Sequence, residues 1–317
     1  MRKFVLPALV AAASLGMYAC GGDDSGGGAA EAPSQTTTAA TFPVTLEGAS
    51  GKALTITSRP ERIVSLSPTA TEMLYAIGAG DQVEAVDDQS NFPPQAPRTK
   101  LSGFQPNVEA IAGYRPDLVL LSNDEQDVVA GLDRLSIPTL LLPAAQKLDD
   151  AYGQIELVGK ATGHPSEATA TVAKMKADID AIVAGIPERA VPLTYYHELD
   201  DTLFSVTSQT FIGQIYSLVV RNNIADKADK EGSGYPQLSP EYLVRADPDL
   251  IFLADTKCCG QSAQTLAKRS GFANLAAVKN GTVIPLDDDI ASRWGPRVVD
   301  FLRTVAAAVA KAPTTSE

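Results

Sequence analysis

The sequence predicts an α/β protein built from two similar lobes that are joined by a helical segment. Its 317 residues suffice for about two domains at roughly 150 residues each. Short strand-like runs alternate with helical runs in both halves, a pattern that predicts mostly parallel sheets covered by helices. A segment of the first half also recurs in the second half, which indicates that the two lobes are alike.

The first lobe is expected at residues 42–147. It opens with VTLEG and ALTIT, which predict a small hairpin. Strands and helices then alternate, with runs at 62–67, 68–78, 83–87, 118–122, 125–135 and 138–143. GAGDQ at 78–82 begins like a dinucleotide-binding loop, but it follows a helix and lacks the third glycine, so we interpret it as a helix C-cap.

Residues 148–187 show helical spacing without a strand signal, broken only at Gly163-His164-Pro165, and predict the bridge between the lobes. The second lobe is expected at residues 188–317. Its runs are at 192–199, 210–219, 250–255 and 282–287, followed by a terminal helix at 296–311.

The internal repeat lies in a single register. NVEAIAGYRPDLVLLS in the first half matches SPEYLVRADPDLIFLA in the second, which aligns Glu109 with Glu241 and Asp117 with Asp249 at a constant offset of 132 residues. Charged, proline and apolar positions agree together, and this is hard to obtain by chance.

The charge balance excludes nucleic acid as a partner. Lys and Arg total 26 against 38 Asp and Glu, a net charge of −12, which would repel a phosphate backbone. The same balance excludes a polybasic membrane-surface mode.

The N-terminus predicts export. Arg2 and Lys3 precede a short apolar run, as in a secretory signal peptide at 1–19. Cys20 comes next, and residues 20–41 read as a flexible linker rich in Gly, Ser, Thr and Ala. This layout resembles a bacterial lipoprotein with the lipid on Cys20, although Tyr18 is bulky for a lipobox. The alternative is an ordinary signal peptide with an incidental cysteine.

No catalytic string is present, so we expect no enzyme and no cofactor. The sequence lacks Walker, HExxH and GxSxG motifs, and its two histidines cannot supply a three-histidine metal site. His197, on a predicted strand, is either a hydrogen-bonded strand residue or an axial ligand to a haem or corrinoid metal.

Several motifs agree in order and spacing with one family. RPERIVSLSPTATEMLYAIGAGDQVEAVDDQSNFPPQA, GFQPNVEAIAGYRPDLVLLS, GKATGH, TFIGQIY and YPQLSPEYL resemble the iron-chelate and cobalamin solute-binding proteins of bacterial ABC importers, over residues 59–311. The resemblance implies two lobes bridged by one long rigid helix, with a large ligand clamped in the cleft between them. It further implies a monomer outside the cytoplasm that delivers its ligand to a permease homodimer with ATPase subunits.

The resemblance also implies roles for individual residues. One glutamate on each lobe docks to the permease, and here these are Glu109 and Glu241, matching the repeat. A first-turn glutamate that only favours the helix dipole is the alternative reading of each. The ligand contacts are expected from loops after the strands, at Pro68, Thr69, Phe92, Phe104, Tyr235, Asp289, Arg293 and Trp294.

Cys258 and Cys259 directly follow the strand-like run LIFLAD. In an oxidising compartment this pair either closes as a vicinal disulfide or stays free.

The expected function is therefore capture of a corrinoid such as cobalamin by a lipid-anchored solute-binding protein. Ferric siderophore or haem is the alternative ligand, since an aromatic and cationic pocket suits all three. A secreted two-lobed α/β enzyme is the remote alternative.

Overall fold

A computed structural model describes residues 41–47 and 53–313 of the chain. These residues belong to one compact unit, Thr38–Glu317. The expected signal peptide at 1–19, Cys20 and the linker up to residue 40 lie outside the described residues. Within the described part, no helix is long and apolar enough to cross a membrane.

The first lobe is a five-stranded parallel sheet in the order β5-β4-β3-β6-β7. Its central strands are buried over their whole length and rich in Ile, Val and Leu, as expected for a parallel sheet covered on both faces. An antiparallel hairpin of β1 and β2 precedes the sheet. The strands are β1 (Val44–Glu47), β2 (Ala53–Ile56), β3 (Ile63–Leu66), β4 (Val83–Asp87), β5 (Arg98–Leu101), β6 (Leu118–Leu121) and β7 (Thr139–Leu141). The helices are α1 (Pro68–Ala76), α2 (Val108–Ala112) and α3 (Val128–Arg134), with short 3₁₀ helices at Gly80–Gln82 and Glu125–Asp127.

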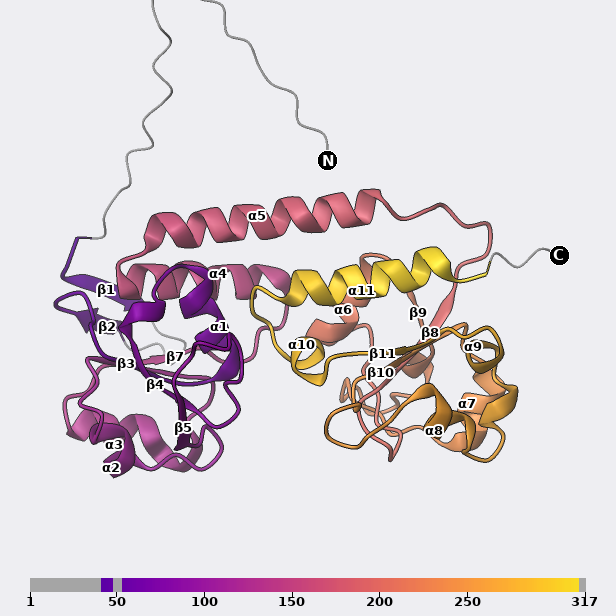
Figure 1. Ribbon diagram of the computed structural model, residues 1–317, viewed down its shortest axis with the longest axis horizontal. Helices are drawn as coiled ribbons and strands as arrows, with labels where there is room; N and C mark the ends of the chain where they lie inside the picture. Colours follow the sequence, from indigo (N-terminus) through magenta and orange to yellow (C-terminus); the bar gives the residue numbers. More distant parts are fainter. Residues whose placement is uncertain (1–40, 48–52, 314–317) are drawn as a thin grey trace, which may run out of the picture. The chain divides into compact units, whose positions relative to one another are not determined.

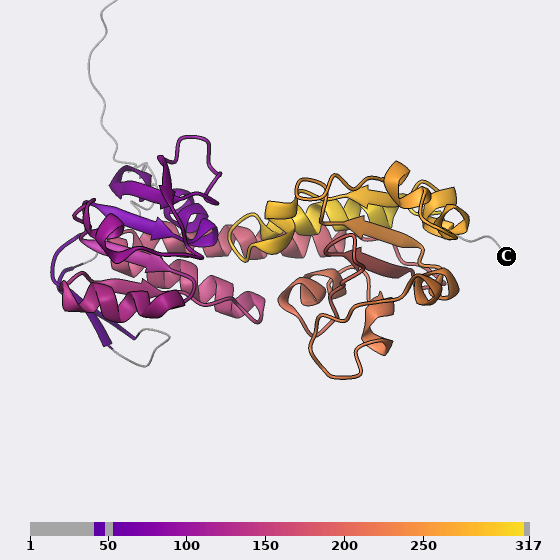
Figure 2. The same cartoon turned by 90° about the horizontal axis from the view of Figure 1, so that it is seen from below.

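The second lobe is a four-stranded parallel sheet in the order β11-β10-β8-β9. Figure 2, which is seen from below, shows the elements of the two lobes as two separate groups in front of the long helices. The strands are β8 (Thr194–Glu198), β9 (Asn222–Asn223), β10 (Leu250–Leu253) and β11 (Val283–Pro285). The helices are α6 (Phe211–Ser217), α7 (Pro240–Ala246), α8 (Ala263–Ala267), α9 (Ala276–Lys279), α10 (Asp288–Ser292) and α11 (Val298–Lys311), with 3₁₀ helices at Ile224–Lys227 and Phe272–Asn274.

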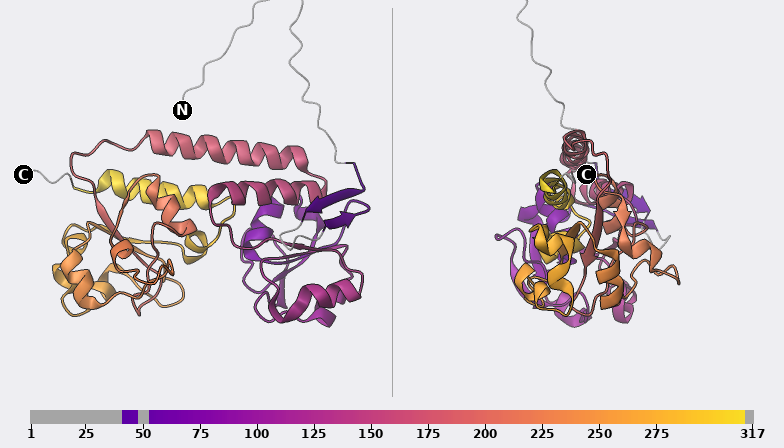
Figure 3. Two further views of the ribbon diagram at one scale, coloured as in Figure 1. Left: turned by 180° about the vertical axis from the view of Figure 1, so that it is seen from behind. Right: turned by 90° about the vertical axis from the view of Figure 1, so that its right-hand side faces the viewer.

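The segment predicted as the bridge, 148–187, contains two helices, and the second of them is the long helix that joins the lobes. α4 (Leu148–Thr162) ends at Gly163, which adopts a left-handed φ of 86°, and Pro165 occupies the first turn of α5 (Pro165–Ala184). The chain therefore reverses at Gly163-His164-Pro165. Figures 1 and 3 show α5 lying alongside α4 and then α11, so α5 alone passes from one lobe to the other.

The repeat organises both lobes in the same way. β6 and β10 begin and end 132 residues apart, and Glu109 and Glu241 each occupy the second position of the helix before the strand, α2 and α7. Asp117 accepts the backbone N–H groups of Glu61 and Arg62 just before β3 (both 3.0 Å). Asp249 accepts that of Thr194 at the start of β8 (2.7 Å), so the repeated aspartate ties two neighbouring strands together in each lobe.

Candidate ligand-binding cleft

Two adjoining hollows lie at the carboxyl ends of the strands, where loops of both lobes converge. The first has a volume of about 480 Å³ and the second about 350 Å³, and they share Ala144, Ser292 and Trp294. We call the two hollows together the cleft. The first is lined mainly by Leu66, Ser67, Pro68, Thr69, Asp87, Gln89, Gly103, Phe104, Ser122, Asn123, Asp289 and Arg293. The second is lined mainly by Ala145, Gln146, Gln209, Thr210, Phe211, Ile212, Asp229, Gly232, Ser233, Gly234 and Tyr235.

Pro68 and Thr69 reach the first hollow because α1 begins directly after β3. Ser67 caps the helix, its Oγ accepting the N–H of Ala70 at 3.3 Å, and Pro68 fits the first helical position. Thr71 below them bonds the hydroxyls of Ser65 and Ser90, both at 2.9 Å, which fixes this edge of the hollow.

Trp294 lies between the two hollows and lines both. It follows Arg293, whose extended backbone ends α10, and it packs partly buried against the main core. Its Nε1–H donates to Oε1 of Gln154 on α4 at 2.9 Å. The hydrogen bond to α4 thus fixes one edge of the indole, while the rest of the ring borders the cleft.

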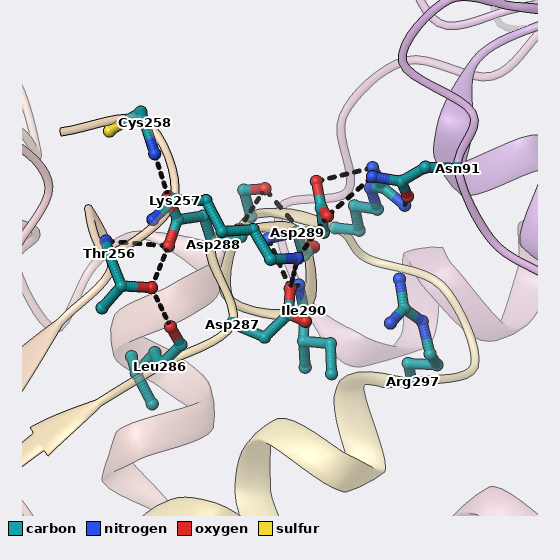
Figure 4. A network of polar contacts seen from close by, with 12 residues as sticks. Asn91, Thr256, Lys257, Cys258, Leu286, Asp287, Asp288, Asp289, Ile290 and Arg297 are labelled. Carbon is teal, nitrogen blue, oxygen red and sulfur yellow. Dashed lines mark hydrogen bonds and ion pairs between the residues drawn. The ribbon is translucent and has the colours of Figure 1, made fainter. Parts of the chain in front are cut away.

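A run of three aspartates holds the loop after β10 against α10 (Figure 4). Asp288 accepts the N–H groups of Thr256, Lys257 and Cys258 at 2.9–3.0 Å. The ammonium of Lys257 contacts Asp287 and Asp289, both at 2.7 Å. Burial acts to raise the pKa of Asp289, but its bonds from Lys257 and Asn91 and the nearby Arg293 outweigh burial and lower it. Asp289 is therefore ionised at neutral pH.

Arg293 belongs to an ion-pair cluster that joins the two lobes. Its guanidinium contacts Glu72 of α1 (2.8 Å) and Asp289 (2.8 Å), and it is almost completely buried. Asn91 of the first lobe also donates to Asp289 at 2.8 Å (Figure 4). The ligand contact of Arg293 stays a prediction. Its ion pair with Glu72 is a contact that the sequence did not indicate.

Besides Trp294, three aromatic residues were predicted as ligand contacts, and only two of them line the cleft. Phe104, 71% exposed, lines the first hollow, and Tyr235, 49% exposed, lines the second. Tyr235 follows a turn in which Asp229 accepts the N–H groups of Ser233 and Gly234. Phe92 lines neither hollow, and its ring lies 4.2 Å from the guanidinium carbon of Arg297.

Sequence reasoning missed Asp87, the last residue of β4. It lines the first hollow, is 2% exposed, and its Oδ1 has no hydrogen-bond partner among the described residues. Burial raises the pKa of Asp87 to about 6. Asp87 ends a predicted strand, and a polar side chain at the carboxyl end of a strand could have indicated a site residue.

His197 does not line the cleft, and of its two interpretations the structure supports the hydrogen-bonded strand residue and contradicts the axial metal ligand. The imidazole is fully buried on the face of β8 that packs on α6, where Nδ1 is 2.8 Å from the hydroxyl of Tyr216. Burial lowers the pKa of His197 to about 3, which keeps it neutral. Among the described residues no cluster of three metal-ligating side chains occurs.

Cys258 and Cys259 are joined as a vicinal disulfide in the exposed loop after β10. Neither residue lines the cleft. The N–H of Cys258 donates to Asp288 at 3.0 Å, so the aspartate run fixes the start of this loop (Figure 4).

Glu109 and Glu241 are both exposed, and neither side chain makes an ion pair or hydrogen bond that the structure records with a described residue. Figure 1 shows α2 and α7 on the same side of their lobes, away from α5. The two carboxylates are thus presented in the same helical position on the same side of the two lobes.

Two lobes with parallel sheets, a bridging helix and a cleft between them define a solute-binding protein. The family model described as periplasmic binding protein matches residues 63–290, and the chain belongs to this family. The predicted fold class and family are both confirmed.

Two curated relatives match most of the chain. The chain is 30% identical to the uncharacterized ABC transporter substrate-binding lipoprotein YvrC of Bacillus subtilis, over 84% of this chain and 86% of that protein. It is 33% identical to the cobalamin-binding protein of Halobacterium salinarum, over 84% of this chain and 74% of that protein.

Solved structures agree with this fold. The periplasmic vitamin B12 binding protein BtuF of Vibrio cholerae matches with a TM-score of 0.61 at 26% identity, over 79% of this chain and 96% of BtuF. The periplasmic heme-binding protein RhuT of Roseiflexus sp. RS-1 matches with a TM-score of 0.67 at 23% identity, over 78% of this chain and 97% of RhuT. At 23% identity, the match to RhuT shows a shared fold and nothing more.

Proposed function

We propose that the protein binds a corrinoid such as cobalamin and delivers it to the permease of an ABC importer. The observation that carries this proposal is the cleft itself. Trp294 stands between two hollows of about 480 and 350 Å³, with the exposed rings of Phe104 on one lobe and Tyr235 on the other. A large flat ligand needs such a wide opening with aromatic surface on both sides. Similarity to the cobalamin-binding protein of Halobacterium salinarum supports the same ligand.

Delivery requires a docking surface and a place near the membrane. We assign docking to Glu109 and Glu241, because two equivalent exposed carboxylates suit a permease built from two identical subunits. We assign anchoring to a lipid on Cys20, with residues 1–19 as the signal peptide that is removed and residues 20–41 as the tether. The similarity to the lipoprotein YvrC supports the anchor.

Calorimetric titration of the purified mature protein with cyanocobalamin, haemin and ferric siderophores tests the ligand. We expect one site that binds cyanocobalamin most tightly. Tightest binding of haemin or a ferric siderophore would assign the alternative ligand of the same class. Turnover of any of these compounds would favour the remote alternative of a secreted enzyme.

A further inference from the structure

Glu72 forms ion pairs with two arginines, of which Arg293 lines the cleft. Glu72 is 3% exposed on α1 of the first lobe, and both arginines come from the second lobe. Arg293 Nη1 lies 2.8 Å from Oε1 of Glu72, and Arg297 binds both oxygens, with Nε at 3.0 Å and Nη2 at 2.5 Å. Burial acts to lower the pKa of Arg297, but the bonds to Glu72 outweigh burial and raise it.

Arg293 has little hydrogen-bonding capacity left for a ligand. Its Nη1 donates to Glu72 and also to Asn91 Oδ1 (3.1 Å). Its Nη2 donates to the carbonyl oxygen of Gln89 (3.0 Å) and to Asp289 (2.8 Å). Four of the five N–H groups of a guanidinium are therefore directed at protein acceptors.

The remaining charge in the cleft is negative. The charged residues that line the two hollows are Arg293, Asp87, Asp229 and Asp289. Arg293 is matched by Glu72 and Asp289, and Lys257, beside the cleft, is matched by Asp287 and Asp289. A ligand carboxylate that enters here meets no free cation among the described lining residues, and it loses its hydration without a partner.

We propose that Glu72 is a specificity-determining residue. Glu72 pairs with Arg293, the one cation among the described residues that line the two hollows, and with the nearby Arg297. The cleft is thus left without a free cation, so it selects a ligand fringed with amides over one fringed with carboxylates. This inference rests on the proposed function only in taking the cleft as the ligand site. It separates the amide-fringed corrinoids from haem, whose propionates are ionised, although both are large flat rings.

The test compares pairs of ligands that share one ring system and differ in the charge of their peripheral groups. Cyanocobalamin is matched with a derivative in which one peripheral propionamide is hydrolysed to the carboxylate, and haemin is matched with its dimethyl ester. The parent protein should bind the monocarboxylate about tenfold more weakly than cyanocobalamin, and this gap should narrow at 1 M salt because salt screens the repulsion. Glu72→Gln leaves the positive charge of Arg293 and Arg297 less neutralised. In this variant the two ligands should therefore differ in dissociation constant by no more than about threefold.

Two further variants complete the design. Asp178→Asn is the control, because it also removes one carboxylate charge from an ion pair, the one with Lys174 on α5. This variant should discriminate between cyanocobalamin and the monocarboxylate as strongly as the parent protein does. If Glu72→Gln does not fold, because a buried ion pair is broken, Asp289→Asn frees one N–H of Arg293 and should also narrow the gap.

Equal or tighter binding of the monocarboxylate by the parent would overturn the proposal, as would an unchanged gap in the folded Glu72→Gln and Asp289→Asn variants. If the protein binds no corrinoid, the proposed function fails and the porphyrin pair decides the inference. Tighter binding of the dimethyl ester would support it, and tighter binding of free haemin would overturn it. A protein that binds none of the four ligands contradicts both proposals.

Discussion

Replacing Trp294 by alanine tests whether the ligand packs at the junction of the two hollows. A tryptophan side chain offers roughly 250 Å², and the partly buried Trp294 exposes only a minor part of it, so a ligand would cover on the order of 60 Å². Covering it contributes about 1.5 kcal/mol at about 25 cal/mol per Å², and ring stacking adds about 0.5–1.5 kcal/mol. Trp294→Ala should therefore weaken cyanocobalamin binding by about 30- to 150-fold.

The assay must not depend on tryptophan fluorescence, because Trp294 is the only tryptophan of the chain. Calorimetry or equilibrium dialysis gives the dissociation constant of each variant. Trp294→Phe is the matched control, since it keeps an aromatic face and loses the bond from Nε1 to Gln154, and it should cost less than about tenfold. Normal affinity in a well-folded Trp294→Ala protein would refute the assignment, and a large loss of melting temperature with normal residual binding would make Trp294 a core residue.

Three further outcomes follow from the structure. Removal of residues 1–41 should leave a folded monomer that binds ligand with the affinity of the longer chain, and loss of folding or binding in calorimetry would contradict the assignment of a tether. Glu109→Lys combined with Glu241→Lys should abolish uptake in cells, because these exposed charges set docking to the permease. Ligand affinity should stay within a few-fold of the parent. A large loss of affinity would place the two residues in the ligand site. Asp87 has a folded pKa of about 6, above its unfolded value, so its ionisation costs stability as the pH rises from about 4 through 6. Asp87→Asn should therefore raise the free energy of unfolding at pH 8 by on the order of 1–3 kcal/mol, with no gain at pH 4, and an equal gain at both pH values in urea titrations would refute this.

The sequence predicted the elements whose signal is local. β4 matches the predicted strand residue for residue, and the repeat register carries through to β6 and β10. β5, with the polar sequence RTKL, and β9, with only two residues, lack any apolar run and were not predicted. The division of this segment into α4 and α5, at residues 148–187, was visible as a break in the pattern. The direction in which the chain turns there was not, because it depends on the packing of α5 against α4 and α11.

The candidate site was harder to predict because its contacts are long-range. Trp294 and Phe104 were expected from the family resemblance, in loops that follow strands, and they do line the cleft. The partner of Arg293, Glu72, lies 221 residues earlier within a predicted helix, where a glutamate reads as an exposed polar position. Of the two interpretations of His197, the hydrogen-bonded strand residue agrees with the structure, because β8 is buried on both faces and its histidine packs inside the lobe.

A crystal structure of the mature protein with cyanocobalamin would show where the ligand binds. We expect one ligand in the cleft, in contact with Trp294 and with residues of both lobes such as Phe104 and Tyr235, while the contacts of Glu72 with Arg293 and Arg297 remain. A ligand bound outside the cleft, or one whose carboxylate or phosphate displaces Glu72 from these arginines, would contradict this expectation.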